Sequence, residues 1–177
     1  MATLVQDLLI GAGAGIVGGF ALGGAAASLY TLTSPENVRR ETEIEPRDPY
    51  IVLTQKVEAL TDVKLSEAQE KHSELGIATG MAAVGGAVYA AVARQWPLGW
   101  LAGGAVFGAM FWAVGDEGMG TALGLVGDNT KYPAEAHLRG LAAHTVFGVV
   151  TAALVEVLNR PATSRPQPAR ADARNRH

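Results

Sequence analysis

The chain has 177 residues, of which 49% are hydrophobic, and it carries 22 glycines, no cysteine and a formal net charge of −3. This length suits one domain, and the lack of cysteine excludes a disulfide framework and a thiolate metal site. The slightly acidic balance offers no basic footprint, so we expect no nucleic-acid partner. Abundant glycine together with concentrated apolar residues is typical of membrane helices that approach each other closely.

The first apolar segment covers residues 8–35, which contain no charged residue. Because a helix needs about 20 apolar residues to cross a bilayer, this run predicts a first membrane span. A cleaved signal peptide is the rival interpretation, since Ala25, Ala26 and Ala27 offer small residues for cleavage. The residues before the run include Asp7 but no Lys or Arg, whereas a signal peptide begins with a positive region.

Residues 36–71 are rich in charges of both signs and are expected to form a helical insertion between the first two spans. Within the insertion, four apolar residues share one helical face and predict a short amphipathic helix on the membrane surface. They are Ile51, Leu53, Val57 and Leu60. Ser66, followed three residues later by Gln69, has the pattern of a capping box and predicts a second helix that runs into the next span.

Three further apolar runs predict the remaining spans. Residues 76–93 and 98–115 form a helical hairpin whose turn, residues 94–97, contains Trp96 and Pro97. The fourth run, residues 140–155, is interrupted only by His144. Residues 119–136 are expected to be a loop.

The predicted fold is all-α, an integral membrane bundle of four glycine-rich transmembrane helices formed by residues 1–160. Residues 161–177 alternate Pro, Ala, Arg and Ser and are expected to be a disordered basic tail. With four spans, the N-terminus, the 94–97 turn and the tail share one side. The two sides carry similar numbers of basic residues, but those of the other side lie mainly in a long, acid-rich loop, so we expect the basic tail and both termini to be cytoplasmic.

Glycines recur at intervals of four along each predicted span and would let neighbouring backbones approach, as in a glycine zipper. The expected packing positions are Gly11, Gly15, Gly19, Gly23, Gly76, Gly80, Gly104, Gly108, Gly140 and Gly148.

Polar residues near these rows form the candidate site. His72 continues the row of Gly76, Asp116 continues the row of Gly108, and His144 lies within the row of Gly140, so all three should face protein. The candidate polar or metal site, toward the loop side of the membrane, comprises His72, Asp116, Glu117, Glu135, His137 and His144. Such groups could bind a transition metal or relay protons. Alternatively, the carboxylates are solvated interfacial charges and His144 is hydrogen-bonded within the bundle.

The order of features resembles the YagU-like family of small bacterial inner-membrane proteins. The resembling residues are 45–49 (EPRDP), Leu65, Ser66, His72, Gly76, Gly80, Tyr89, Gly104, Gly108, Trp112, Glu135, His144 and Gly148. The likeness covers roughly residues 40–158, and it departs at Glu45, where a second proline would stand, and at Asp116 and Glu117, where a histidine would. The resemblance implies a multi-span bacterial inner-membrane protein, without an established substrate or catalytic residue.

Signatures of common enzymes are missing from the sequence: it contains no Gly-x-Ser-x-Gly, phosphate-loop or His-Glu-x-x-His motif. We therefore expect no enzymatic activity and no cofactor. The expected role is structural or accessory, with the chain packing against its own copies or a membrane partner within the lipid bilayer. The alternatives are ion or small-solute transport or proton handling by an oligomer and, third, a metal or haem protein that uses His72, His137 and His144.

Overall fold

The computed structural model describes residues 3–45 and 47–159, and within these ranges the fold is all-α, as predicted. The helices in chain order are α1 (Leu4–Tyr30), α2 (Pro35–Ile44), α3 (Pro49–Thr61), α4 (Glu67–Ala93), α5 (Trp100–Trp112) and α6 (Ala134–Asn159). A π-helix, η1 (Ala113–Gly120), follows α5 directly, and a short 3₁₀ helix, η2 (Asn129–Lys131), precedes α6. The expected tail, residues 161–177, lies outside the described residues.

Three of the helices are long and apolar enough to cross a membrane. They are α1 and α4, with 27 residues each, and α6, with 26 residues. At 1.5 Å per residue each spans about 40 Å, which exceeds the roughly 30 Å of a hydrocarbon core. The chain is therefore suited to a multi-pass place in a lipid bilayer. The second and fourth apolar runs lie within α4 and α6, and α1 contains the first run as far as Tyr30.

The run at residues 98–115 is not a single α-helix. The α-helical part, α5, has 13 residues, and the chain then winds as a π-helix to Gly120. Helical structure therefore continues past Asp116 and Glu117, and the expectation of a loop across residues 119–136 is wrong at both ends, since α6 already begins at Ala134. Both carboxylates lie within η1 and face histidines of α6.

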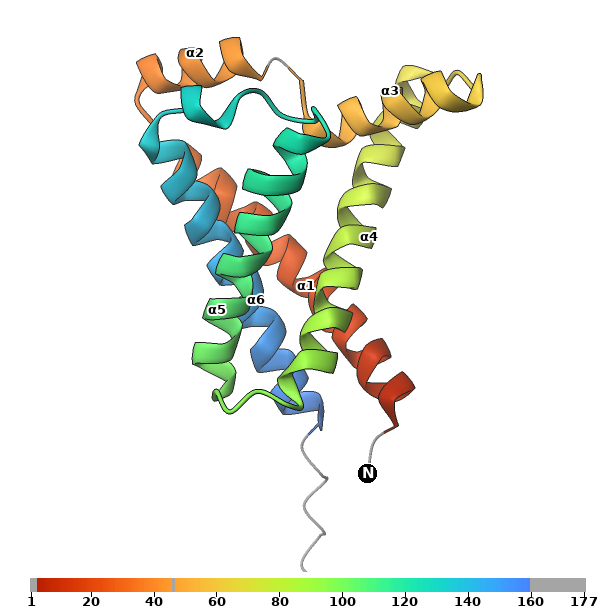
Figure 1. Cartoon of the computed structure of the whole chain (residues 1–177), viewed down its shortest axis with the longest axis vertical. Helices are drawn as coiled ribbons and strands as arrows, with labels where there is room; N and C mark the ends of the chain where they lie inside the picture. The colour runs from red at the N-terminus through yellow and green to blue at the C-terminus, as the bar shows by residue number, and fades with distance from the viewer. Residues whose placement is uncertain (1–2, 46, 160–177) are drawn as a thin grey trace, which may run out of the picture.

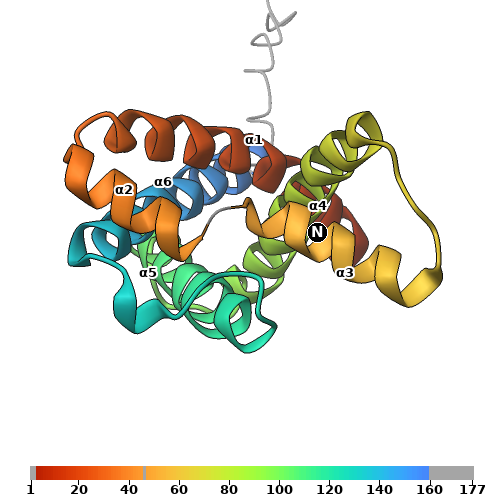
Figure 2. The same ribbon diagram turned by 90° about the horizontal axis from the view of Figure 1, so that it is seen from above.

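The long helices form a bundle in which α1 crosses diagonally behind the others (Figure 1). The first helix packs against both α4 and α6, while α5 packs along α6. The beginning of α1, the turn between α4 and α5, and the end of α6 lie at one end of the bundle (Figure 1). We call this the turn end, and we call the opposite end, crossed by α2 and α3, the loop end (Figure 2).

The insertion between α1 and α4 contains two helices before α4 begins. Ser34 caps α2 by accepting a hydrogen bond from the backbone of Asn37, and Pro35 is its first residue. We did not predict this helix. The second, α3, covers the predicted amphipathic segment, and the predicted capping box at the start of α4 is present, with Ser66 N donating to Gln69 Oε1 over 2.9 Å.

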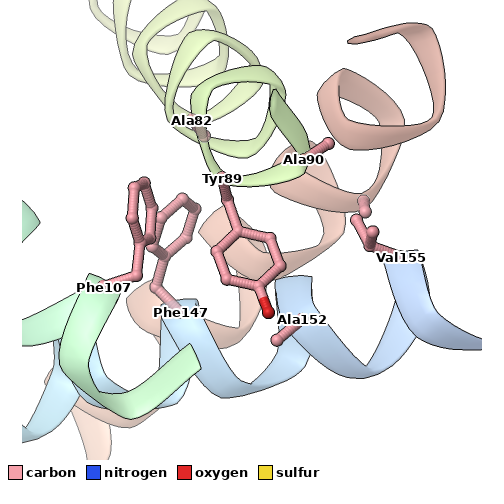
Figure 3. Packing of buried hydrophobic residues seen from close by; sticks show 8 residues of the cluster. Ala82, Tyr89, Ala90, Phe107, Phe147, Ala152 and Val155 are labelled. Carbon is pink, nitrogen blue, oxygen red and sulfur yellow. The ribbon is translucent and has the colours of Figure 1, made fainter. Parts of the chain in front are cut away.

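The core is built from aromatic rings packed against very small residues (Figure 3). Tyr89 from α4 meets Phe107 from α5 edge-on, with ring centroids 5.3 Å apart, and Phe111 stacks on Phe147 from α6 at the same centroid distance. These rings fill the space between α4, α5 and α6. Elsewhere glycine and alanine bring the helices close, and the next subsection describes those contacts.

Candidate functional site

Glycines bring α1 and α4 into backbone contact. A Cβ atom added to Gly11 would lie 2.5 Å from the carbonyl oxygen of Gly86 and 2.6 Å from Ala90 Cβ. One added to Gly15 would lie 2.8 Å from Gly86 Cα, and one on Gly19 would lie 2.8 Å from Ala82 Cβ. Since real Cβ atoms do not approach so closely, the observed crossing of α1 and α4 requires glycine at these positions.

The contact between α5 and α6 is built in the same way. A Cβ on Gly104 would lie 2.6 Å from the carbonyl oxygen of Gly148, and a Cβ on Gly148 would lie 2.7 Å from Gly108 N. Near the loop end, Gly140 leaves room for the indole of Trp112, whose Nε1 would lie 2.7 Å from an added Cβ. These four glycines belong to the expected packing set.

The remaining expected positions do not pack within the described chain. No described atom lies within 4 Å of a Cβ placed on Gly23, Gly76 or Gly80. Several glycines that we did not select are close-packed as well. A Cβ on Gly86 would lie 2.5 Å from Gly15 Cα, one on Gly18 would lie 3.0 Å from the carbonyl oxygen of Phe147, and one on Gly85 would lie 3.0 Å from the Phe111 ring. A spacing of four defines a row on one helix, but it does not say which row meets a neighbour.

The six residues of the candidate polar site do not form one group. His72 lies near the beginning of α4, on the α3 side of the bundle, whereas α6 begins beneath α2 (Figures 1 and 2). Its Nδ1 is 2.5 Å from the Ala68 carbonyl of its own helix. Glu135 accepts a 2.6 Å hydrogen bond from Asn37 on α2. The other four residues form two separate pairs between η1 and α6.

The first pair is Glu117 with His137. Glu117 Oε1 lies 2.6 Å from His137 Nδ1, and the other ring nitrogen, Nε2, lies 3.2 Å from the backbone oxygen of Asn129. The side-chain amide of Asn129 completes the arrangement by donating to the Glu117 backbone oxygen over 2.8 Å and to Oε2 over 3.0 Å. Three elements, η1, η2 and α6, therefore meet at this polar contact.

The second pair is Asp116 with His144, which lies about two helical turns after His137 on α6. His144 is only 9% exposed, and its Nδ1 lies 3.0 Å from the Gly140 carbonyl. Its Nε2 is 3.6 Å from Asp116 Oδ2, a distance of electrostatic contact rather than of a hydrogen bond. His144 therefore has a partner inside the bundle, the Asp116 carboxylate of η1.

Neither pair makes a metal centre. In the described ranges, no three His, Asp or Glu side chains come together in a way that could hold a metal ion. Protein sites for transition metals supply at least three ligands as a rule. The arrangement at the loop end is one of carboxylate–imidazole contacts, whose chemistry is proton binding and electrostatic attraction.

Two further ion pairs carry buried charge, and we did not predict either from the sequence. At the loop end, Arg139 on α6 pairs with Glu41 on α2 at 2.5 Å, donates to Thr33 Oγ1 over 2.9 Å, and lies 4.7 Å from the centroid of the Tyr30 ring. At the turn end, Asp7 pairs with Arg94. The partners are far apart along the chain, so no local pattern indicated them.

A hollow of about 420 Å³ lies beneath α2 and the start of α3. It is lined by Tyr30, Glu41, Thr42, Glu45, Arg47, Asp48, Pro49 and Tyr132. Each carboxylate has a partner in the chain itself: Glu41 binds Arg139, Asp48 caps Tyr50 N, and Glu45 accepts the Tyr132 hydroxyl over 2.5 Å. Burial raises the pKa of Glu45, and the Tyr132 hydrogen bond partly opposes that effect.

Comparison with known proteins finds no matching family model, no matching curated protein and no matching solved structure. The function is therefore argued from the helices and their contacts.

Proposed function

We propose that this chain is a structural or accessory protein of the bacterial inner membrane, which crosses the bilayer four times and packs through glycine-bearing helix faces with its own copies or with a membrane partner. The inner membrane is what the YagU-like resemblance implies. No catalytic step belongs to the proposal.

The fourth crossing is the one made by α5 and η1. This segment runs along α6, a helix of membrane length, at glycine-to-glycine distance, and it therefore shares the apolar surroundings of α6. Its outward side chains include Leu101 and Met110, which are 56% and 53% exposed. Four crossings put both termini on one side, and the arginines that the sequence places after residue 159 favour the cytoplasm for that side.

The observation that carries the packing role is an unused face on α4. Gly76 and Gly80 have open space where a side chain would stand, and Val84 and Val88 continue the same row with 61% and 47% of their surface exposed. Small residues at a spacing of four let another helix approach in a membrane. This row points away from the contact that α4 makes with α1, so it is available to a second protein.

Cysteine cross-linking in native membranes tests this face, because the chain has no cysteine of its own. We expect Val84→Cys to form cross-linked species, either a dimer of the chain or an adduct with one membrane protein. The matched control is Val17→Cys on α1, which is similarly exposed at 51% and should cross-link far less. Adding Gly80→Leu to Val84→Cys should abolish the product without unfolding the protein, since no neighbouring helix among the described residues comes within 4 Å of a Cβ placed on Gly80. Equal labelling of both cysteines by lipid-soluble reagents with no cross-link would contradict the proposal.

Proton handling is a second candidate, and the pair of Asp116 with His144 favours it. Ionisable groups within or beside a membrane span often serve ion pathways. Proteoliposomes in a pH gradient would show a proton flux that His144→Gln removes if this candidate is right, and none if the chain is purely structural.

A further inference from the structure

His137 has an oxygen acceptor at each of its two ring nitrogens. Nδ1 lies 2.6 Å from the Glu117 carboxylate, and Nε2 lies 3.2 Å from the Asn129 carbonyl oxygen. A neutral imidazole carries one N–H and can donate to only one of these acceptors, whereas the doubly protonated ring can donate to both. Only the doubly protonated ring can therefore hold η1 and η2 through both contacts at once.

The bridge is part of a closed ring of contacts. The backbone oxygen of Asn129 faces His137 Nε2, and the side-chain amide of Asn129 donates two hydrogen bonds to Glu117, at 2.8 and 3.0 Å. The side chains of His137 and Glu117 are 30% and 28% exposed, so water competes only in part for these contacts. If the ring loses one N–H, the lone pair of that ring nitrogen faces a lone pair of the neighbouring oxygen, and the two repel each other.

The charges around His137 are mostly negative or neutralised. From η1 it faces Glu117, with Asp116 next in the chain; from the loop before α6 it faces the edge of the Tyr132 ring, whose hydroxyl is bound to Glu45 at the end of α2. The cations of the neighbouring elements are engaged elsewhere: Lys131 of η2 with Asp128, and Arg139 of α6 with Glu41. The positive charge of a protonated His137 therefore lies beside a carboxylate and is not repelled by a nearby cation.

His144 repeats the pattern seven residues further along the same helix. Its Nδ1 faces the Gly140 carbonyl and its Nε2 faces Asp116, so both nitrogens again look toward oxygen. Adjacent carboxylates on η1 thus meet two histidines on one face of α6. The contact at Asp116 is looser, which makes His137 the better-defined of the two.

We propose that His137 is a proton-controlled latch: with both ring nitrogens protonated it fastens the segment between η1 and α6, and on losing a proton it releases that segment at the loop end. Only one of its two acceptors keeps an N–H after deprotonation, so the contact from His137 to either η1 or η2 is lost and the segment between them is held less firmly. The membrane helices need not move. The latch would make the loop-end surface responsive to pH, and it stands whether or not the chain associates through α4.

Hydrogen exchange of residues 121–133, followed by mass spectrometry on the full chain in lipid nanodiscs, tests the latch. With exchange corrected for its intrinsic pH dependence, protection should rise about tenfold or more from about pH 8 to about pH 5.5, because a charge-assisted hydrogen bond is gained. His137→Gln, which can donate from one side only, should flatten this profile. The matched control His72→Gln, a histidine away from the segment, should leave it intact.

A flat profile in the unmutated chain, or an unchanged profile in His137→Gln, would overturn the proposal. Should His137→Gln fail to fold, nitrogen NMR of the histidine rings of the unmutated protein gives the same decision. As pH is lowered, one ring should gain its second N–H in step with the rise in protection of residues 121–133. Protonation of every histidine ring without a change in that protection would overturn the latch.

Discussion

Asp7 on α1 lies 2.7 Å from Nε of Arg94, at the end of α4, and its side chain is only 4% exposed. The pair joins the first turn of one membrane helix to the residue that caps the end of another, at the turn end of the bundle. Its carboxylate is enclosed, whereas the Arg94 side chain is 45% exposed. The stability of this end should therefore depend more on the guanidinium than on the carboxylate.

The first prediction compares the two halves of this pair. Arg94→Gln leaves a buried carboxylate without its cation and should lower the free energy of unfolding by about 2–3 kcal/mol, somewhat below the usual cost because Arg94 is half exposed. Asp7→Asn removes the charge itself and should cost less. Thermal unfolding in detergent measures both, and a larger loss for Asp7→Asn would contradict this account.

The second prediction concerns glycine packing. Gly148→Ala places a methyl group against the backbone of α5, 2.7 Å from Gly108 N, and should destabilise the bundle by about 1–3 kcal/mol through overpacking. The control is Gly23→Ala, where nothing lies within 4 Å and alanine is the better helix former. Unfolding of the two variants in the same detergent should separate them clearly; equal stabilities would refute the close contact of α5 with α6.

The third prediction tests the ion pair in which both terminal nitrogens of Arg139 donate to the carboxylate of Glu41. Both side chains are enclosed, at 14% and 10% exposure, and the guanidinium also lies over Tyr30. Lysine cannot reproduce two-pronged pairing, so Arg139→Lys should cost about 1–3 kcal/mol of stability. The exposed pair of Arg39 with Glu43 supplies the control, because Arg39→Lys there should change stability by less than about 0.5 kcal/mol.

The fourth prediction follows from Glu45. Burial raises its pKa in the folded protein, so its contribution to stability is present below the unfolded pKa and is lost as pH rises through the folded one. Glu45→Gln keeps an acceptor for Tyr132 and removes the charge. The variant should therefore gain stability relative to the unmutated protein as pH rises from about 4 to about 7, a difference that melting temperatures at matched pH would reveal.

Tyr132→Phe should show the opposite pH trend, because it removes a hydrogen bond that is stronger when the Glu45 carboxylate is ionised. Its stability deficit should grow as pH rises over the same range. Parallel pH profiles for the two variants would mean that Glu45 and Tyr132 do not act on one another as the structure indicates.

The sequence was informative wherever a helix is defined by its own residues. Uncharged runs predicted α1, α4 and α6, and the capping box at Ser66 and Gln69 placed the start of α4. The same kind of signal was present for α2, where Ser34 precedes Pro35 and Glu36, but we overlooked this short helix because most of its residues are charged or polar. The π-helical winding after Trp112 carried no signal that we recognised.

Contacts between helices were much harder to predict. Rows of glycine showed which positions could pack, but the rotation of each helix decided that Gly11 meets α4 while Gly76 meets nothing in the described chain. The polar site failed as a single group for a related reason. The sequence placed His72 and His137 on the same side of the membrane, but it did not say how their helices are arranged around the bundle. The beginnings of α4 and α6 lie on opposite sides of it (Figure 2).

The most direct test of the packing role is the mass of the intact complex, gently extracted from the membrane and measured by native mass spectrometry with elemental analysis. The account predicts a metal-free assembly that contains more than one copy of the chain or a membrane partner, and it predicts that Gly76→Leu with Gly80→Leu reduces the assembly to single chains. A single chain from the unmutated protein, or a stoichiometric metal or haem, would contradict it.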